Sequence, residues 1–121
     1  MRLHALRGAT SVEVDERQAI LDATSELMRE LLARNTLCAE DLVSCLFTMT
    51  PDLKAEFPAV AAREIGLSGV PLMCAQEIGV PGALPRIIRV MVHCYPPDGA
   101  TPQHVYLGEA QKLRLDLQGA Q

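Results

Sequence analysis

Four arginines lie at the ends of predicted elements or inside apolar strands, and a glutamate, a tyrosine and a cysteine accompany them. Arginine holds carboxylates through paired hydrogen bonds, so this set favours an anionic ligand. We find no Ser/His/Asp or Cys/His signature, no phosphate-binding loop and no metal-ligand spacing. The pattern therefore indicates binding, or a reaction that needs only placement and electrostatics. The set comprises Arg7, Arg63, Arg89, Arg114, Glu77, Tyr106 and Cys74.

The stretch between residues 70 and 92 contains the most informative pair in this set. It predicts two apolar strands, at 70–77 and 86–92, joined by a Gly/Pro-rich connection. Glu77 closes the first strand, and Arg89 lies in the middle of the second between two apolar residues. An unpaired buried charge is costly, so the two residues form a structural ion pair or face a polar ligand.

The rest of the chain predicts the elements that position these side chains. Asp15 and Gln18 fit a capping box at the start of the clearest helix, whose apolar residues recur at helical spacing. Pro58 suits the first position of a second, shorter helix. The expected elements are a strand at 2–7, a helix at 15–35, a strand at 42–50, a short helix at 57–65, strands at 70–77, 86–92 and 104–107, and a helical or extended tail at 108–117.

This order of elements predicts an α+β or α/β fold with one mixed β-sheet. We assign residues 1–121 to a single domain. One long helix can cover only one face of such a sheet, and the other face is equally apolar. We therefore expect the uncovered face to be buried against other subunits of a homo-oligomer.

Composition excludes several classes of protein. A hydrophobic content of 49% excludes disorder, and a net charge of −4 argues against nucleic acid as the main partner. An anionic small molecule stays possible, because the local field in a cleft outweighs net charge. No signal peptide or membrane-spanning apolar run is visible, so we expect a cytoplasmic protein with no membrane partner. The scattered cysteines indicate reduced core residues: Cys38, Cys45, Cys74 and Cys94.

Nine short blocks follow one another along almost the whole chain: RGAT (7–10), TPDL (50–53), FPA (57–59), ARE (62–64), VP (70–71), CAQE (74–77), IRV (88–90), HVYL (104–107) and LRLDL (113–117). Together they resemble the AroH-class chorismate mutases, the small monofunctional enzymes that are distinct from the all-helical class. No single block is specific, but nine in register are hard to obtain by chance.

The resemblance implies the conversion of chorismate to prephenate, a Claisen-type rearrangement in aromatic amino acid biosynthesis. The reaction is unimolecular and uses no cofactor, metal or covalent intermediate. The implied fold is an α+β pseudo-barrel homotrimer of the kind also seen in YjgF-like proteins. Its three active sites lie in clefts between neighbouring subunits.

The resemblance also implies a role for each residue. Arg7 and Tyr106 match residues that contact a substrate carboxylate. Arg89 matches an arginine that donates to the ether oxygen, and Glu77 a glutamate that accepts from the ring hydroxyl. Cys74 matches a cysteine near that hydroxyl. The wall positions are Phe57, Ala59, Leu72, Met73 and Leu113, while Arg63 and Arg114 match the entrance and the tail cover.

Three details do not fit the pattern simply. Val60 stands where a charged residue is usual and Met73 where threonine is usual, which concerns affinity more than chemistry. Cys74 and Glu77 are three residues apart, and a regular strand directs them to opposite faces. We therefore expect the strand to have bent before Glu77, or to contain a bulge.

Two other functions are weighed against this one. YjgF-like proteins are trimers with an arginine in each intersubunit cleft, and they act on enamines or bind ketoacids. They are not expected to combine the Glu77/Arg89 pair with the RGAT block. A non-catalytic trimer that uses the cleft for sensing or assembly is the other alternative.

Overall fold

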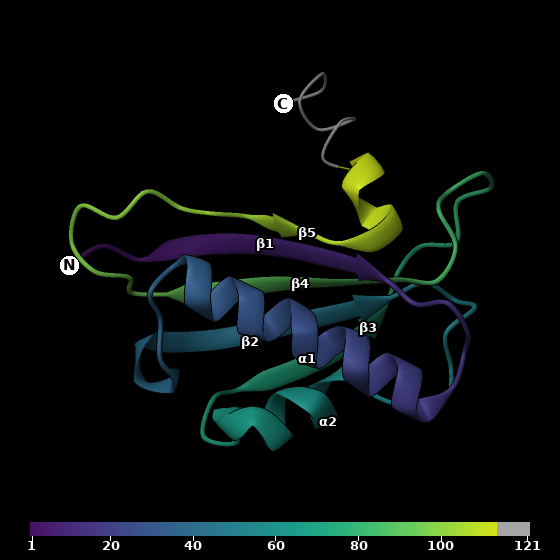
Figure 1. The fold of residues 1–121 in the computed structure, drawn as a ribbon, viewed down its shortest axis with the longest axis horizontal. Helices are drawn as coiled ribbons and strands as arrows, with labels where there is room; N and C mark the ends of the chain where they lie inside the picture. The colour runs from purple at the N-terminus through teal and green to yellow at the C-terminus, as the bar shows by residue number, and fades with distance from the viewer. Residues whose placement is uncertain (114–121) are drawn as a thin grey trace.

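A computed structural model describes residues 1–113 and shows a mixed five-stranded sheet with two helices on one face (Figure 1). The strand order is β3-β2-β4-β1-β5, with β1 and β2 antiparallel to β4, β3 parallel to β2, and β5 parallel to β1. The predicted α+β class and element order are confirmed. The elements are β1 (His4–Ser11), α1 (Arg17–Arg34), η1 (Ala39–Asp41), β2 (Leu42–Met49), α2 (Pro58–Ala62), η2 (Arg63–Leu67), β3 (Leu72–Gln76), β4 (Ile87–Cys94), β5 (Val105–Tyr106) and η3 (Gly108–Ala110).

Strand β1 is longer than the sequence predicts. It continues to Ser11, so Arg7 lies inside the strand and not after it. The extension pairs with β4 as far as Ser11, opposite Ile87, and contains Gly8, which faces α1: a Cβ on Gly8 would lie 2.7 Å from Leu31 Cδ1 and 3.2 Å from Leu27 Cδ1. The missing side chain lets the helix approach the strand closely, and the strand continues beneath it.

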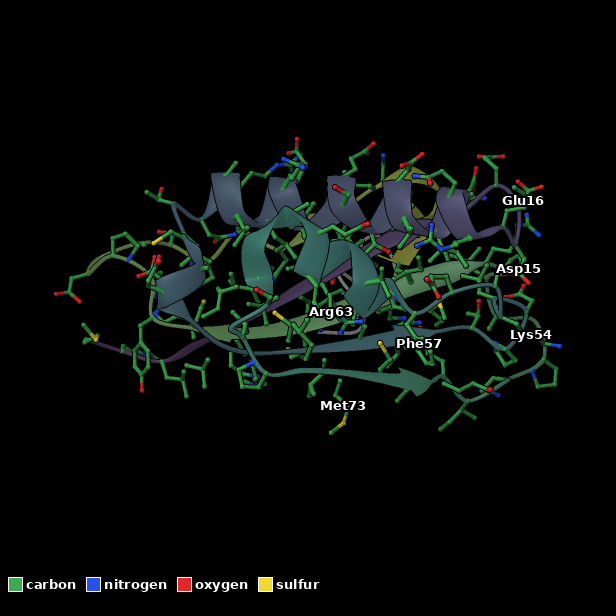
Figure 2. The ribbon with its side chains drawn as sticks, turned by 90° about the horizontal axis from the view of Figure 1, so that it is seen from below. Asp15, Glu16, Lys54, Phe57, Arg63 and Met73 are labelled. Atoms are coloured by element: carbon green, nitrogen blue, oxygen red, sulfur yellow. The ribbon has the colours of Figure 1, made fainter. Side chains whose placement is uncertain are left out.

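Two helices, and not one, cover this face of the sheet. Leu67 of η2 and Ala62 of α2 belong to the same buried cluster as Leu27 and Met28 of α1. Figure 2 shows both helices on the same side of the strands. Pro58 occupies the first turn of α2, as predicted, because its missing N–H needs no partner there.

The start of α1 differs from the prediction. The helix begins at Arg17, its N-cap residue is Glu16, and no side chain caps it. Asp15 instead bonds to a distant loop: its Oδ1 accepts from the backbone N–H groups of Lys54 (2.9 Å) and Ala55 (3.0 Å). Asp15 and Lys54 lie together at one end of the molecule in Figure 2. The local capping motif was overridden by this long-range contact.

The face opposite the helices keeps apolar side chains in contact with solvent. Leu46 is 40% exposed and Met73 is 62% exposed, and Met73 points away from the helices (Figure 2). Part of this face is covered by the chain after β5, where Ala110 packs with Ala9 and Ile87. Within residues 1–113, no helix is both long and apolar enough to cross a membrane.

Gly8 yields a first prediction about stability. Replacing Gly8 by Val places methyl groups where Leu31 and Val90 already lie, and such overpacking costs about 1–3 kcal/mol. Chemical denaturation should show that loss in the free energy of unfolding. Gly69→Val is the matched control, because a Cβ at Gly69 meets nothing within 4 Å. Equal stability of the two variants would contradict the close approach of α1 to β1.

Asp15 yields a second prediction. Asp15→Ala removes the acceptor of two exposed backbone donors of the 54–55 loop, which water can then solvate, so we expect a loss of about 1 kcal/mol in the free energy of unfolding. The neighbouring Glu16→Ala serves as control, since Glu16 makes no capping bond. If Asp15 capped the helix instead, its loss would lower the protection of the first α1 amides against hydrogen exchange and spare those of residues 54 and 55.

Candidate active site

Arg89 and Glu77 form an ion pair on the face of the sheet opposite the helices. Arg89 Nε lies 3.0 Å from Glu77 Oε1, and the other oxygen of Glu77 accepts from the Thr48 hydroxyl at 3.0 Å. The Glu77 side chain is 16% exposed, whereas half of the Arg89 side chain remains exposed. The pair is thus fixed on the carboxylate side and open to a ligand on the guanidinium side.

The sheet holds both partners rigidly. Arg89 lies in β4, paired with Thr48 of β2 on one side and with Ala9 of β1 on the other. Glu77 follows the last residue of β3, and its N–H still donates to Met49 O at 2.9 Å, which continues the β2–β3 ladder. Because strands on both sides of Arg89 and the β2 ladder beside Glu77 set the positions of the two backbones, neither charge needs to reorganise when a ligand arrives.

The expected bend or bulge before Glu77 is absent. Strand β3 pairs with β2 in unbroken register from Leu72 to Gln76. Regular alternation directs Glu77 to the Thr48 and Arg89 side, and Cys74 to the opposite side, where it packs against the main core. Among the described ladders, the register shift lies between Leu42 and Ser44 of β2.

A cavity of about 320 Å³ lies beside Arg89. Arg7 and Tyr106 line it with Arg89, and Thr48 forms part of its wall. The remaining lining is mainly apolar, from Leu46, Val90 and Met91 among others. Two guanidinium groups and a phenol in an apolar hollow suit an anion with an apolar body. The structure thus brings together four of the predicted residues, here called the Arg89 group: Arg7, Glu77, Arg89 and Tyr106.

Other predicted residues lie elsewhere. Phe57, at the start of α2, is 64% exposed and shares a cavity of about 380 Å³ with Cys74. This cavity and the one beside Arg89 have no lining residue in common. Arg63 is exposed at the end of α2, and Figure 2 shows it on the same side of the molecule as Phe57. We call Phe57 and Arg63 the Phe57 group.

The remaining wall positions are divided between core and surface. Ala59 is buried in the main core, and Leu72 packs against that core. Met73 is exposed on the open face of the sheet. Leu113 packs near Tyr106 in the cluster that covers Ala9. Arg114 lies outside the described residues.

The cysteines are free, but they are not all core residues as predicted. Cys45 and Cys94 are buried, and burial raises the pKa of Cys45 to about 11. Cys38 is exposed, which contradicts the prediction for that residue. It lies just before η1, and hydrogen bonds to the Glu40 and Asp41 carboxylates raise the pKa of its thiol. Within residues 1–113, no three His, Cys, Asp or Glu side chains gather as a metal site.

Sequence reasoning missed Thr48 and His104. Thr48 orients Glu77, and the Nδ1 atom of His104 accepts from the backbone N–H of Arg7 at 3.0 Å. The signal for Thr48 is its place on β2 opposite Arg89, which requires the strand register. His104 stood within the HVYL block, but a histidine's bond to a backbone group has no sequence signature.

Comparison with known proteins supplies the family. A family model described as chorismate mutase type I matches residues 3–117. The chain is 48% identical over 124 residues to a protein named chorismate mutase AroH from Thermus thermophilus, covering 98% of this chain and 99% of the relative. It is 42% identical over 121 residues to chorismate mutase AroH from Bacillus subtilis, covering 97% and 94%.

The fold agrees with this similarity. A solved structure of the chorismate mutase from Clostridium thermocellum superposes with a TM-score of 0.87 at 42% identity, covering 90% of this chain and 98% of that one. The resemblance found in the nine blocks is therefore confirmed, and the YjgF-like alternative is not favoured. This chain belongs to the type I chorismate mutase family and is an enzyme of aromatic amino acid biosynthesis.

Proposed function

We propose that the chain converts chorismate to prephenate in the cavity beside Arg89, where the charges of Arg89 and Glu77 face the substrate. The observation that carries this is the ion pair itself, two opposite charges fixed 3.0 Å apart beside a cavity that Arg7 and Tyr106 also line. A cofactor-free rearrangement needs groups that stabilise charge and hold the substrate in shape. The Arg89 group contains both kinds.

Arg89 and Glu77 act on the charge that develops during the reaction. As the C–O bond of the ether breaks, negative charge gathers on the ether oxygen and positive charge on the ring. The guanidinium stabilises the oxygen, and the carboxylate, which accepts from the ring hydroxyl, stabilises the ring. Thr48 bonds one oxygen of Glu77 and so keeps the other directed toward Arg89 and the substrate. This electrostatic stabilisation lowers the barrier without any covalent step.

Arg7 and Tyr106 place the substrate. They line the cavity beside Arg89, from two neighbouring strands, and suit a substrate carboxylate. Holding the flexible enolpyruvyl arm folded over the ring removes conformational freedom before the reaction begins. The other residues keep the roles that the family resemblance implies. Cys74 lies near the ring hydroxyl and Arg114 covers the site. The wall is formed by Ala59, Leu72, Met73 and Leu113.

A second copy of the chain completes the site. The Phe57 group does not reach the Arg89 cavity within one chain, and the exposed face of Phe57 leaves a large aromatic side chain in water. The apolar residues of the open sheet face are likewise uncovered. A homotrimer with sites between neighbours brings the Phe57 group of one copy to the Arg89 group of the next. The four free cysteines support a cytoplasmic location.

The mechanism makes a prediction for Arg89. Removing one oxyanion donor costs about 3–4 kcal/mol, so Arg89→Ala should lower kcat by on the order of a thousandfold. Arg89→Lys keeps the charge but loses the planar fork, and should recover little. The measurement is the loss of chorismate absorbance at saturating and at low substrate.

The control for that experiment is Arg29→Ala. Arg29 lies on α1, bonds to Ser25 and is remote from the Arg89 cavity, so its loss should leave kcat unchanged. If Arg89→Ala raised KM alone and kept kcat, Arg89 would only clamp a carboxylate and the mechanism would be wrong.

The shared site makes a separate prediction. Arg89→Ala and the double variant Phe57→Ala/Arg63→Ala damage the two groups on different chains. When the two variants are refolded together, random assembly should leave about a quarter of the sites intact, because each site draws one group from each of two copies. The mixture should regain about that share of wild-type activity at low chorismate.

The matched control mixes Arg89→Ala with Glu77→Ala. Both changes lie in the Arg89 group, so no mixed site contains a complete pair and activity should stay low. Equal recovery in both mixtures, or none in the first, would contradict a site shared between copies.

A further inference from the structure

Strand β5 is only two residues long, yet it positions Tyr106 in the wall of the cavity beside Arg89. Val105 pairs with Gly8 and Tyr106 with Ala9, beside β1 at the edge of the sheet (Figure 1). A backbone bond from Leu107 N to Ala9 O, at 2.9 Å, follows the pairing. So short an edge strand has few ladder bonds of its own, and side chains must help to hold it.

His104 provides one of these contacts. Ala9 O accepts from Leu107, so the backbone groups of alternate residues of β1, Arg7 included, point toward β5. At Arg7 the ladder has not yet begun, because β5 starts at Val105. The His104 ring takes the place of a backbone acceptor there, with Nδ1 3.0 Å from the Arg7 nitrogen.

Asn35 provides the second contact, one residue earlier. Its Nδ2 donates to Gln103 O at 2.9 Å, and its Oδ1 accepts from Gln103 N at 2.8 Å. Asn35 is 5% exposed at the end of α1, where the same Nδ2 also donates to Leu31 O. These bonds fix the backbone of Gln103 to the end of α1, and this places the next residue, His104, beside Arg7.

The bond to Arg7 requires a neutral His104 ring. A protonated imidazole carries hydrogen on both nitrogens and cannot accept from an N–H group. Although His104 is exposed overall, partial burial of its ring and, next, the positive charge of Arg7 lower its pKa. Both effects favour the neutral ring, and because Nδ1 accepts from Arg7, the proton of that neutral ring lies on Nε2.

We propose that His104 is a positioning residue for substrate binding. By accepting from the Arg7 backbone, it holds the start of β5 against β1, so that the Arg7 and Tyr106 side chains meet the same carboxylate. His104 acts through these two residues and needs no contact with the substrate. This inference deepens the proposed function and rests on it.

The test compares two replacements at His104. Asn places its Oδ1 at nearly the same distance from the backbone as Nδ1 and can accept the same bond, whereas Leu cannot. A net hydrogen bond is worth about 1 kcal/mol, so His104→Leu should lower kcat/KM about fivefold, mainly through KM. His104→Asn should keep most of the wild-type value. His4→Leu, at the first residue of β1 and outside the lining of the Arg89 cavity, is the matched control and should keep it fully.

A double-mutant cycle tests the route through Arg7. If His104 works by placing Arg7, then His104→Leu should cost less when Arg7 is already Ala, about twofold or under, with the remainder due to Tyr106. Equal losses in both backgrounds would overturn the proposal. So would equal losses for His104→Leu and His104→Asn, because the acceptor would then be irrelevant.

Nitrogen NMR of the wild-type protein gives a readout that does not depend on activity. The His104 ring should show an unprotonated Nδ1 and a scalar coupling across the hydrogen bond to the Arg7 amide. A proton on Nδ1, or no coupling, would overturn the proposal even if His104→Leu failed to fold. Absence of chorismate turnover in the wild type would instead refute the proposed function and leave this bond in place.

Discussion

The candidate site depends on one constraint, the placement of β2 between β3 and β4. Glu77 comes from the end of β3 and Arg89 from the centre of β4, so these residues are not on adjacent strands. Thr48 of β2 lies between them, paired with Arg89 and bonded to Glu77. A one-residue slip of β2 would turn the Thr48 side chain to the helix face, and Glu77 would lose the partner that orients it.

This constraint explains what sequence could and could not predict. The order of elements, the mixed sheet and the position of Arg89 inside a strand follow from local patterns of apolar residues and from Gly and Pro. The partner of Asp15 could not be predicted, because the 54–55 loop is 39 and 40 residues away and the nearby Gln18 offered a plausible local cap. Gln18 instead donates to Asp22.

The sequence also predicted the candidate site only in part. Arg89 and Glu77 stood out because charges are rare in apolar strands, and their pairing in the structure follows from the register. Thr48 carried no such signal, since threonine is ordinary in a strand. The expectation of a bulge before Glu77 came from assigning Cys74 and Glu77 to one place around the substrate. The regular strand separates them, and Cys74 packs toward the helices.

The two faces of the sheet are covered differently in the single chain, and this difference is the basis for proposing that a second copy completes the site. The helix face is closed by α1 and α2, with Gly8 allowing α1 to lie close to the strand. The open face carries the charges, together with apolar residues such as Leu46 and Met73 that water surrounds in the isolated chain. In the proposed trimer, another copy would cover that face and remove water from the Arg89–Glu77 pair. Because a charge acts more strongly at low dielectric, assembly that buries the apolar face would also strengthen the field that the reaction uses.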